Sequence, residues 1–356
     1  MADFRRILII KLSSIGDVVH TLPAVHNLKR ALPSVEVDWL VENKSKVLLE
    51  GNSAVSKVID VDTHRWRQER GFASLSEMKG VFSKLRDRQY DFALDFQGLW
   101  KSAAFGYFSG ARRLIGFDRQ HLKEPGCRIL YDVRVVPRSG AVHVIDLNKE
   151  LLRGLDIVPG DTHFELPNRS EDREYIEQQL KSQSVRDFVV INPGGGWSTK
   201  NWDPQNYATL HQRLTTATGL KSVLTWGPGE LPLIDEIRRC SSAESPVVFP
   251  TTLTQFVALA RRARLFIGGD TGPLHIAAAC KTPIVGIYGP TDPARNGPFH
   301  QDDIVVSHQV PCGPCYKRSC EIYKTECLRL VTVDEVFKAA LRRLSSEPTT
   351  PATEVP

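Results

Sequence analysis

The sequence lacks a long apolar run. No stretch reaches about 18 apolar residues, the length needed to cross a membrane as a helix, so we expect no membrane-spanning segment in the 356 residues. The apolar run at 7–10 ends at Lys11, and no small-residue cleavage site follows it. That pattern predicts a first strand and not a signal peptide. We therefore expect a cytoplasmic protein.

Features of nucleic-acid-binding proteins are also missing. The net charge is only +5, and no basic patch is interleaved with aromatic residues in the manner of single-strand binders. No zinc-finger spacing ends in paired histidines. A modest positive charge permits an acidic ligand or an anionic membrane surface, and we expect no nucleic-acid partner.

The glycine pattern of dinucleotide-dependent oxidoreductases is absent. Those enzymes carry G-x-G-x-x-G after the first strand, with an acidic residue about 20 positions later. The loop at 13–17 contains one glycine, Gly16. This excludes a nicotinamide-dependent oxidoreductase from the candidate functions.

Metal-binding patterns are weak. Of seven cysteines, four form a C-x2-C-x4-C-x6-C pattern: Cys312, Cys315, Cys320 and Cys327. The first pair has a spacing that suits a metal, but the rest matches no known ligand pattern, and reduced thiols are the rule in a cytoplasmic protein. The string DVD at 60–62 matches an Asp-x-Asp metal motif. It closes a strand, however, and lies far in sequence from the glycine-rich segment at 268–279. We expect no metal to be required, and the sequence leaves the role of the four cysteines open.

Strand-like and helix-like segments alternate along the chain. The expected strands are 6–12, 35–41, 57–61, 91–96, 113–117, 133–136, 188–192, 222–226, 246–249, 265–268 and 284–288. The expected helices include 25–31, 77–88, 99–108, 205–215, 231–240, 254–262 and 273–279. Such alternation predicts parallel sheets covered by helices, that is, an α/β fold with two doubly wound halves.

The alternation is interrupted at 158–173, where prolines, glycine and asparagine break the pattern. We predict an N-terminal domain at 1–165 and a C-terminal domain at 170–345. The tail at 346–356 is rich in Pro, Thr and Glu, has little to bury, and is expected to be disordered. Ligands of open α/β sheets bind beyond the carboxyl ends of the strands, so two such domains would face each other across a cleft that holds the active site.

A glycine-rich junction at 268–279 joins an apolar strand to a helix of small residues. Glycines let backbone N–H groups approach an anion, and the helix N-terminus adds partial positive charge. Asp270, Thr271 and His275 supply polar groups there. The junction predicts a phosphate or nucleotide cradle, although Asp270 could instead be a helix N-cap and His275 a packed core residue.

The first strand is followed by a similar loop, SSIGD at 13–17. Asp17 lies near the start of the next helix. It is either the N-cap of that helix or a carboxylate held as a general base. The local sequence favours neither role over the other.

Several motifs together resemble the bacterial lipopolysaccharide heptosyltransferases, glycosyltransferase family 9, and most closely their heptosyltransferase I branch. The motifs are KLSSIGDVVHTLPA at 11–24, HRWR at 64–67, DFQGLWKSA at 95–103, GDTGPLH at 269–275 and GPTDP at 289–293. They occur in the family's order, and the similarity runs from about residue 6 to about residue 340. The resemblance implies the GT-B fold, with two Rossmann-like domains, the acceptor on the first and the donor on the second.

The resemblance also implies a reaction: inverting transfer of heptose from ADP-heptose to the Kdo region or inner core of lipopolysaccharide. Asp17 would be the general base, and Lys200 would assist the departing diphosphate as a cation. Thr271 and Gly272 would bind the diphosphate, Asp270 the heptose and Glu230 the ribose. The full donor-binding set is Ser13, Ser14, Gly16, Lys200, Glu230, Asp270, Thr271, Gly272 and His275.

Basic residues would bind the anionic acceptor, since arginine binds carboxylates and phosphates in bidentate fashion. They are His64, Arg65, Arg67, Lys101 and Lys123; the alternative is an ordinary solvated basic loop. The mixed apolar and basic segment 75–88 could touch the inner membrane peripherally or simply pack on the sheet. A different acceptor, such as the second heptose, and a nucleotide-sugar-binding protein without activity remain alternative functions.

Overall fold

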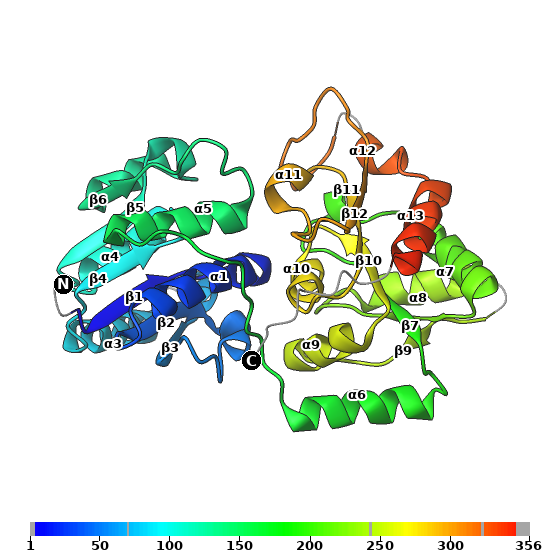
Figure 1. Cartoon of the computed structure of the whole chain (residues 1–356), viewed down its shortest axis with the longest axis horizontal. Coiled ribbons are helices and arrows are strands. Elements are labelled where there is room, and N and C mark those ends of the chain that lie inside the picture. Colours follow the sequence, from blue (N-terminus) through cyan, green and yellow to red (C-terminus); the bar gives the residue numbers. More distant parts are fainter. Residues whose placement is uncertain (1–3, 70, 242–243, 322–323, 347–356) are drawn as a thin grey trace, which may run out of the picture. The chain divides into compact units, whose positions relative to one another are not determined.

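The computed structural model describes residues 4–69, 71–241, 244–321 and 324–346. The chain forms two compact units, Met1–Pro167 and Asn168–Pro356 (Figure 1). The border between them falls in the segment 158–173, where the sequence pattern breaks. Residues 347–356 of the predicted tail lie outside the described residues. No helix in the described part of the chain is long and apolar enough to cross a membrane.

The first unit is built on a parallel sheet of six strands in the order β3-β2-β1-β4-β5-β6. The strands are β1 (Arg6–Ile10), β2 (Glu36–Glu42), β3 (Lys57–Val61), β4 (Phe92–Asp95), β5 (Arg113–Phe117) and β6 (Val133–Val135). Four of the five β1 residues are fully buried. Burial on both faces explains why this strand is a continuous apolar run and not an alternating one.

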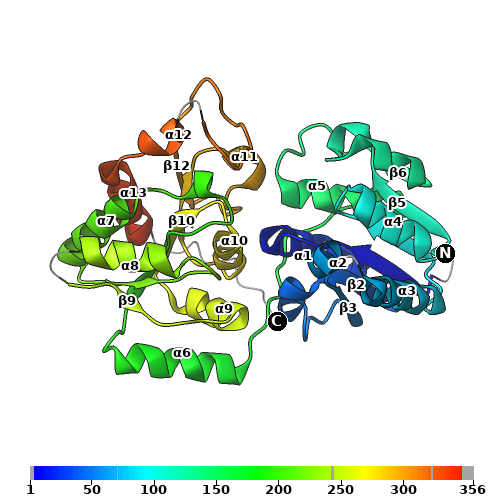
Figure 2. The same ribbon diagram turned by 180° about the vertical axis from the view of Figure 1, so that it is seen from behind.

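Helices flank the sheet of the first unit (Figures 1 and 2). They are α1 (Ile15–Ala31), α2 (Thr63–Glu69), α3 (Phe72–Asp87), α4 (Trp100–Phe108) and α5 (Val144–Glu150), with 3-10 turns at Asn43–Leu48, Arg119–His121, Pro125–Leu130 and Leu151–Leu155. Eleven of the 17 residues of α1 are buried. A helix this buried lies against the sheet and holds its N-terminus at the carboxyl end of β1.

The second unit repeats the same arrangement. Its parallel sheet has the order β12-β11-β10-β7-β8-β9, with β7 (Phe188–Asn192), β8 (Lys221–Leu224), β9 (Val247–Val248), β10 (Leu265–Gly269), β11 (Ile284–Tyr288) and β12 (Ile304–Ser307). Every residue of β7, β10 and β11 is buried. The core includes Trp202, whose Nε1 donates to the Val331 carbonyl oxygen at 3.0 Å.

The helices of the second unit begin and end at recognisable signals. They are α6 (Ser170–Ser182), α7 (Pro204–Thr218), α8 (Leu231–Cys240), α9 (Leu253–Arg262), α10 (Gly272–Ala279), α11 (Pro293–Asn296), α12 (Glu326–Arg329) and α13 (Val333–Ser345), with a 3-10 turn at Ser198–Lys200. Asp203 caps α7 ahead of Pro204, and Gly219 ends it in the left-handed conformation at φ 70°. Capping boxes open α9 and α13.

Both sheets have the strand order of a doubly wound Rossmann fold, 3-2-1-4-5-6 in the numbering of each unit. The direction of winding reverses between β1 and β4, and again between β7 and β10. Ligands of such sheets bind at the carboxyl ends of these two central strands. The predicted residues around Asp17 and Asp270 follow β1 and β10, so each lies at the switch point of its unit.

Some expected elements differ from the structure. The first helix begins at Ile15 and not at residue 25, because burial along α1 outweighs the cost of Pro23 inside it. The segment HRWR, expected as a loop, belongs to helix α2. Strand β12 and helices α5 and α13 were not expected; β12 is half-exposed at the sheet edge, and its apolar run is only three residues long.

Candidate functional site

The loop after β1 places Asp17 in the first turn of α1. Ser14 is the N-cap, so the expectation of Asp17 as N-cap is wrong; Asp17 is the third helical residue. Its Oδ2 accepts hydrogen bonds from the Ser14 amide at 2.8 Å and the Ser14 hydroxyl at 2.9 Å. This reciprocal capping fixes the carboxylate, while a quarter of the Asp17 side chain stays exposed to a ligand.

A buried lysine lies against this carboxylate. Lys11 Nζ is 3.6 Å from Asp17 Oδ1 and donates to the Phe96 carbonyl oxygen at 2.8 Å. Burial raises the pKa of Asp17, but the charges of Lys11 and Lys123 and the Ser14 amide outweigh it and hold that pKa well below its usual range. Burial lowers the pKa of Lys11, although the negative charge of Asp17 acts in the opposite direction and raises it. Asp17 is therefore ionised at neutral pH and able to accept a proton.

The loop after β4 braces the loop after β1. Gln97 Oε1 accepts from the amides of Leu12 at 3.1 Å and Ser13 at 3.2 Å. Fully buried Asp95 holds Gln97 in turn, because its Oδ1 accepts from the Gln97 amide at 2.9 Å. Burial raises the pKa of Asp95, and its second oxygen accepts from the Tyr131 hydroxyl at 2.7 Å. The two central strands thus form one rigid support beneath Ser13, Ser14 and Asp17.

The predicted acceptor residues fall into three places. His64, Arg65 and Arg67 are exposed on α2, where the Arg65 guanidinium pairs with Glu77 of α3. Lys101 is the second residue of α4, and its ammonium is bound to Glu42 Oε1 at 3.1 Å and Thr63 Oγ1 at 2.7 Å. Lys101 therefore ties α4 to the start of α2.

Lys123 is the predicted acceptor residue most clearly associated with Asp17. It is exposed, and its charge helps to lower the pKa of Asp17. The segment that carries it is fixed to the loop after β4, since the Glu124 amide donates to the Gly98 carbonyl oxygen at 3.2 Å. An acceptor anion bound at Lys123 would lie near the carboxylate.

In the second unit, three predicted donor residues meet at the end of β10. Lys200 Nζ donates to both the Asp270 carbonyl oxygen and Asp270 Oδ2 at 2.8 Å, and His275 Nε2 lies 3.0 Å from Asp270 Oδ1. Burial raises the pKa of Asp270, but His275 and Lys200 outweigh it and hold that pKa well below its usual range. An ionised carboxylate can only accept hydrogen bonds, so His275 Nε2 is the donor in the bond to Asp270 Oδ1. His275 thus orients Asp270.

The N-terminus of α10 opens beside this cluster. Thr271, not Asp270, is the N-cap, and its side chain makes no capping bond to the helix amides. The Thr271 hydroxyl instead donates to Asn192 Oδ1 at 3.4 Å, which links the ends of β10 and β7. Gly268 is required here because a Cβ would lie 2.7 Å from the Asn192 carbonyl oxygen. Helix amides without a side-chain cap are suited to bind an anion.

Glu230 lies against the glycine loop that follows β7. Its Oε2 accepts from the Gly227 amide at 2.6 Å, and its carboxylate occupies the space where a Cβ on Gly194 would stand. The next glycine packs on the donor cluster, since a Cβ on Gly195 would lie 3.0 Å from the Thr271 methyl. The structure thus brings together the predicted segments at 194–200, 227–230 and 269–275.

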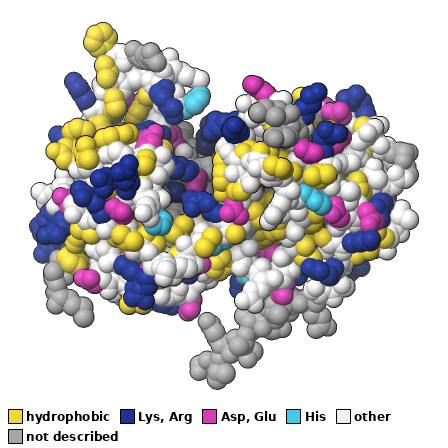
Figure 3. Space-filling view, turned by 90° about the horizontal axis from the view of Figure 1, so that it is seen from above, with side chains coloured by type: hydrophobic (Ala, Val, Ile, Leu, Met, Phe, Trp, Pro, Cys, Tyr) yellow, Lys and Arg dark blue, Asp and Glu magenta, His cyan; other side chains and the backbone are white. Residues whose placement is uncertain are grey.

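Charges on the face drawn in Figure 3 are dispersed. Figure 3 shows Lys and Arg side chains in several separate groups on one face, with Asp and Glu side chains among them.

Within the described ranges, the residues with metal-like spacing form no metal site. Asp60 of the DVD string at 60–62 pairs with Lys46, with 3.4 Å between its Oδ2 and the Lys46 Nζ. Among the residues that the structure describes, no group of three His, Cys, Asp or Glu side chains is arranged to hold a metal ion, and all seven cysteines are free.

Known proteins identify the family of the chain. The model of glycosyltransferase family 9 (heptosyltransferase) matches residues 78–325. The chain belongs to this family. It is 30% identical over 325 residues to lipopolysaccharide heptosyltransferase 1 of Pseudomonas aeruginosa, which covers 90% of the chain and 89% of the relative.

Solved structures agree with that assignment. A family 9 glycosyltransferase of Veillonella parvula superposes with a TM-score of 0.80 at 21% identity, over 97% of this chain and 98% of its own. Heptosyltransferase WaaC of Escherichia coli, solved with ADP, gives a TM-score of 0.76 at 25% identity, over 95% of this chain and 99% of its own. The predicted α/β, GT-B fold of two Rossmann-like domains is confirmed for this glycosyltransferase.

Sequence reasoning missed several residues of these sites. Lys11 stands in the motif at 11–24 but receives no role from the sequence, although a buried lysine directly after a buried strand is itself a signal of a functional cation. Gln97 follows β4 and Asn192 ends β7, both central strands of their sheets, and strand order was needed to pair them with the neighbouring loops.

Proposed function

We propose that this glycosyltransferase moves heptose from ADP-heptose to a hydroxyl in the Kdo or inner-core region of lipopolysaccharide. The observation that carries the proposal is that the family motifs occupy the switch points of both sheets, a carboxylate in the first unit and an anion cradle in the second. The reaction is a single displacement with inversion. It takes place at the cytoplasmic face of the inner membrane.

The donor binds at the second unit. The amides at the start of α10, the Thr271 hydroxyl and Lys200 receive the diphosphate, and Glu230 receives the ribose. Asp270 accepts hydrogen bonds from heptose hydroxyls, held in place by His275 and Lys200. Fixed donors of this kind stabilise the negative charge that develops on the leaving diphosphate.

Asp17 removes the proton of the acceptor hydroxyl as it attacks the anomeric carbon. A carboxylate with a low pKa is a weak base, but the transition state resembles an oxocarbenium ion, in which the attacking hydroxyl becomes acidic. Lys11 keeps the carboxylate ionised and therefore ready. Ser13, Ser14 and Gly16 contact the donor from the same loop.

The acceptor is recognised by basic side chains of the first unit. His64, Arg65, Arg67 and Lys123 bind Kdo carboxylates or lipid A phosphates. Lys101 acts by holding the start of α2, where its ammonium binds Thr63.

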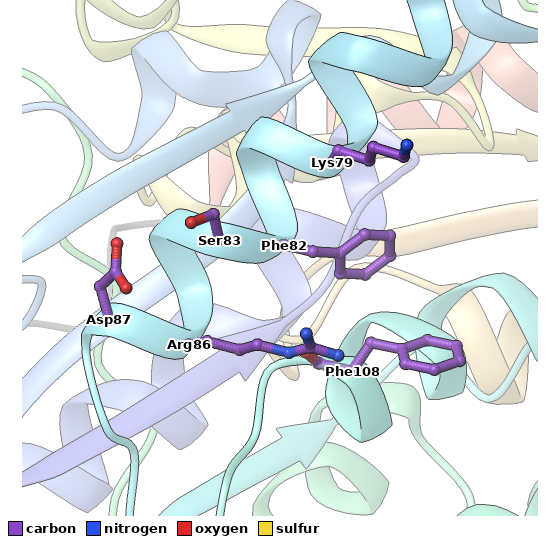
Figure 4. Close-up of a pocket in the computed structure, with 6 residues that line it drawn as sticks. All are labelled: Lys79, Phe82, Ser83, Arg86, Asp87 and Phe108. Carbon is purple, nitrogen blue, oxygen red and sulfur yellow. The ribbon is translucent and has the colours of Figure 1, made fainter.

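A surface formed by α3 and α4 approaches the membrane that carries the acceptor. Phe72 is 93% and Leu75 51% exposed on α3. Figure 4 shows Lys79, Phe82 and Arg86 along one side of α3, next to Phe108 of α4. Apolar and cationic side chains on one face suit an anionic bilayer. Phe72→Ser with Leu75→Ser should reduce sedimentation with phosphatidylglycerol vesicles, whereas Ile129→Ser, which changes another exposed apolar residue, should not.

The reaction requires no metal. The amides at the α10 N-terminus and Lys200 supply the positive charge that a divalent cation supplies in other glycosyltransferases. Activity should persist in EDTA. Loss of activity in EDTA and its return with Mg²⁺ would contradict this part of the proposal.

The test of the function is a screen of nucleotide sugars against truncated lipid A acceptors, read by mass spectrometry. The expected product is a Kdo–lipid A acceptor enlarged by one heptose, with release of ADP. Transfer only to an acceptor that already carries heptose would assign the second heptose instead. Binding of ADP-heptose without any transfer would indicate a nucleotide-sugar-binding protein.

A further inference from the structure

The cysteine-rich segment that follows β12, described over residues 308–321 (Figure 1), touches two loops of the second unit. Near its start, the amides of Cys315 and Tyr316 donate to the Pro290 carbonyl oxygen at 3.1 and 2.9 Å. At the next residue, the Lys317 carbonyl oxygen accepts from the Thr199 hydroxyl at 2.8 Å. The segment is therefore fastened at both of these positions.

The strand order shows what lies beneath it. Pro290 follows β11 and Thr199 follows β7, and β10 is the strand between them. A segment fastened to both neighbours passes over the carboxyl end of β10, where Asp270 and Thr271 lie. Burial raises the pKa of Tyr316, and the charge of Asp270 contributes to the same effect, which agrees with this path.

The Trp197 ring contacts two cations, Lys200 of the group formed with Asp270 and His275, and Arg318 of the cysteine-rich segment. Lys200 Nζ lies 4.5 Å and Arg318 Cζ 5.3 Å from the centre of the Trp197 ring. Cation–π contact with an indole holds both side chains near it. Arg318 is exposed and forms no ion pair with a residue that the structure describes.

The charge of Lys200 alone does not balance that of a diphosphate. Lys200 is bound to the Asp270 carboxylate, so the two side chains nearly cancel. The diphosphate of a nucleotide sugar carries about two negative charges, and arginine binds such oxygens through two parallel hydrogen bonds.

We infer that the segment at 312–320 is a wall of the donor site, and that Arg318, held over the Trp197 ring that Lys200 also contacts, is a second cation for the diphosphate. The inference rests on the proposed function, because it takes the donor to be a nucleoside diphosphate sugar. It also gives the cysteine-rich segment a purpose: its backbone carries Arg318 across the end of β10.

The test is the affinity for ADP, measured by calorimetry on the full chain with Arg318→Ala, Arg318→Lys and the matched control Arg329→Ala. Arg329 is an exposed arginine of α12, also in the cysteine-rich region. Removal of Arg318 should weaken ADP binding ten- to hundredfold, and lysine should restore part of the loss. The affinity for adenosine, which has no phosphate, should stay within twofold, as should ADP binding by Arg329→Ala.

Two failures can be told apart. If Arg318→Ala binds ADP as tightly as the wild type while Lys200→Met binds it more weakly, the inference is wrong and the proposed function stands. If the wild-type protein binds no ADP, the proposed function fails and the inference with it. A loss of adenosine binding equal to the loss of ADP binding would show a merely structural role for Arg318.

Discussion

Replacing Lys11 by methionine tests how the base is kept ionised. Methionine preserves the apolar length of the side chain in a buried position but removes the ammonium that lies 3.6 Å from Asp17 Oδ1. The hydrogen bonds from Ser14 and the charge of Lys123 remain. The substitution therefore isolates one contribution to the pKa of Asp17.

The size of that contribution follows from the geometry. Two unit charges 3.6 Å apart interact by about 2–5 kcal/mol at an effective dielectric constant of about 20–40, and one pKa unit corresponds to about 1.4 kcal/mol. Loss of a cation favours the protonated carboxyl, so the pKa of Asp17 rises. Even with partial screening at its exposed quarter, the acidic limb of activity should move up by more than one pH unit.

The assay is kcat/KM for heptose transfer between pH 3 and pH 8. The wild type should show little loss from Asp17 in this range, because its pKa lies well below the usual carboxyl value. Lys11→Met should lose activity in the acidic part of the range, at a higher pH than the wild type. The control is Lys29→Met, which removes an α1 lysine that binds the Val35 carbonyl oxygen. Identical acidic limbs for Lys11→Met and the wild type would refute the role given to Lys11.

Three further predictions concern the donor site. Lys200→Met removes charge-assisted hydrogen bonds worth about 1.5–3 kcal/mol and should lower kcat by about one to two decades; a change below twofold in steady-state kinetics would contradict it. Gly194→Ala places a Cβ against the Glu230 carboxylate and should weaken ADP binding at least tenfold in calorimetry, whereas Gly196→Ala, which meets nothing within 4 Å, should not. The depressed pKa of Asp270 contributes stability above the ordinary carboxyl pKa that is lost as pH falls, so Asp270→Asn should destabilise more at pH 7 than at pH 3 in denaturant unfolding.

Much of the fold could be predicted from sequence because parallel strands leave a strong signal. Strands β7 and β11 are fully buried, read as unbroken apolar runs, and have the expected bounds. Helix α1 was expected too late, since its start depends on packing against the sheet and not on the local effect of Pro23. Strand β12 has an apolar run of only three residues, since it is an edge strand that is half-exposed.

The candidate site could be predicted in part. The glycine-rich junction at 268–279 carries its own physical meaning, and Asp270, Lys200 and His275 do meet there. The contacts of Lys11 with Asp17, and of Arg318 with Trp197, depend on three-dimensional proximity that no local pattern encodes. Lys101 shows the converse: its motif was recognised, but its ammonium is committed to Glu42 and Thr63.

The central claim is that Asp17 is the base of a heptose transfer. The most direct measurement is the rate of heptose incorporation into Kdo–lipid A by Asp17→Asn, together with the affinity of that variant for ADP. The account predicts a loss of rate of several orders of magnitude with ADP affinity within threefold of the wild type, because the nucleotide cradle belongs to the second unit. An Asp17→Asn protein that transfers heptose at close to the wild-type rate would contradict it.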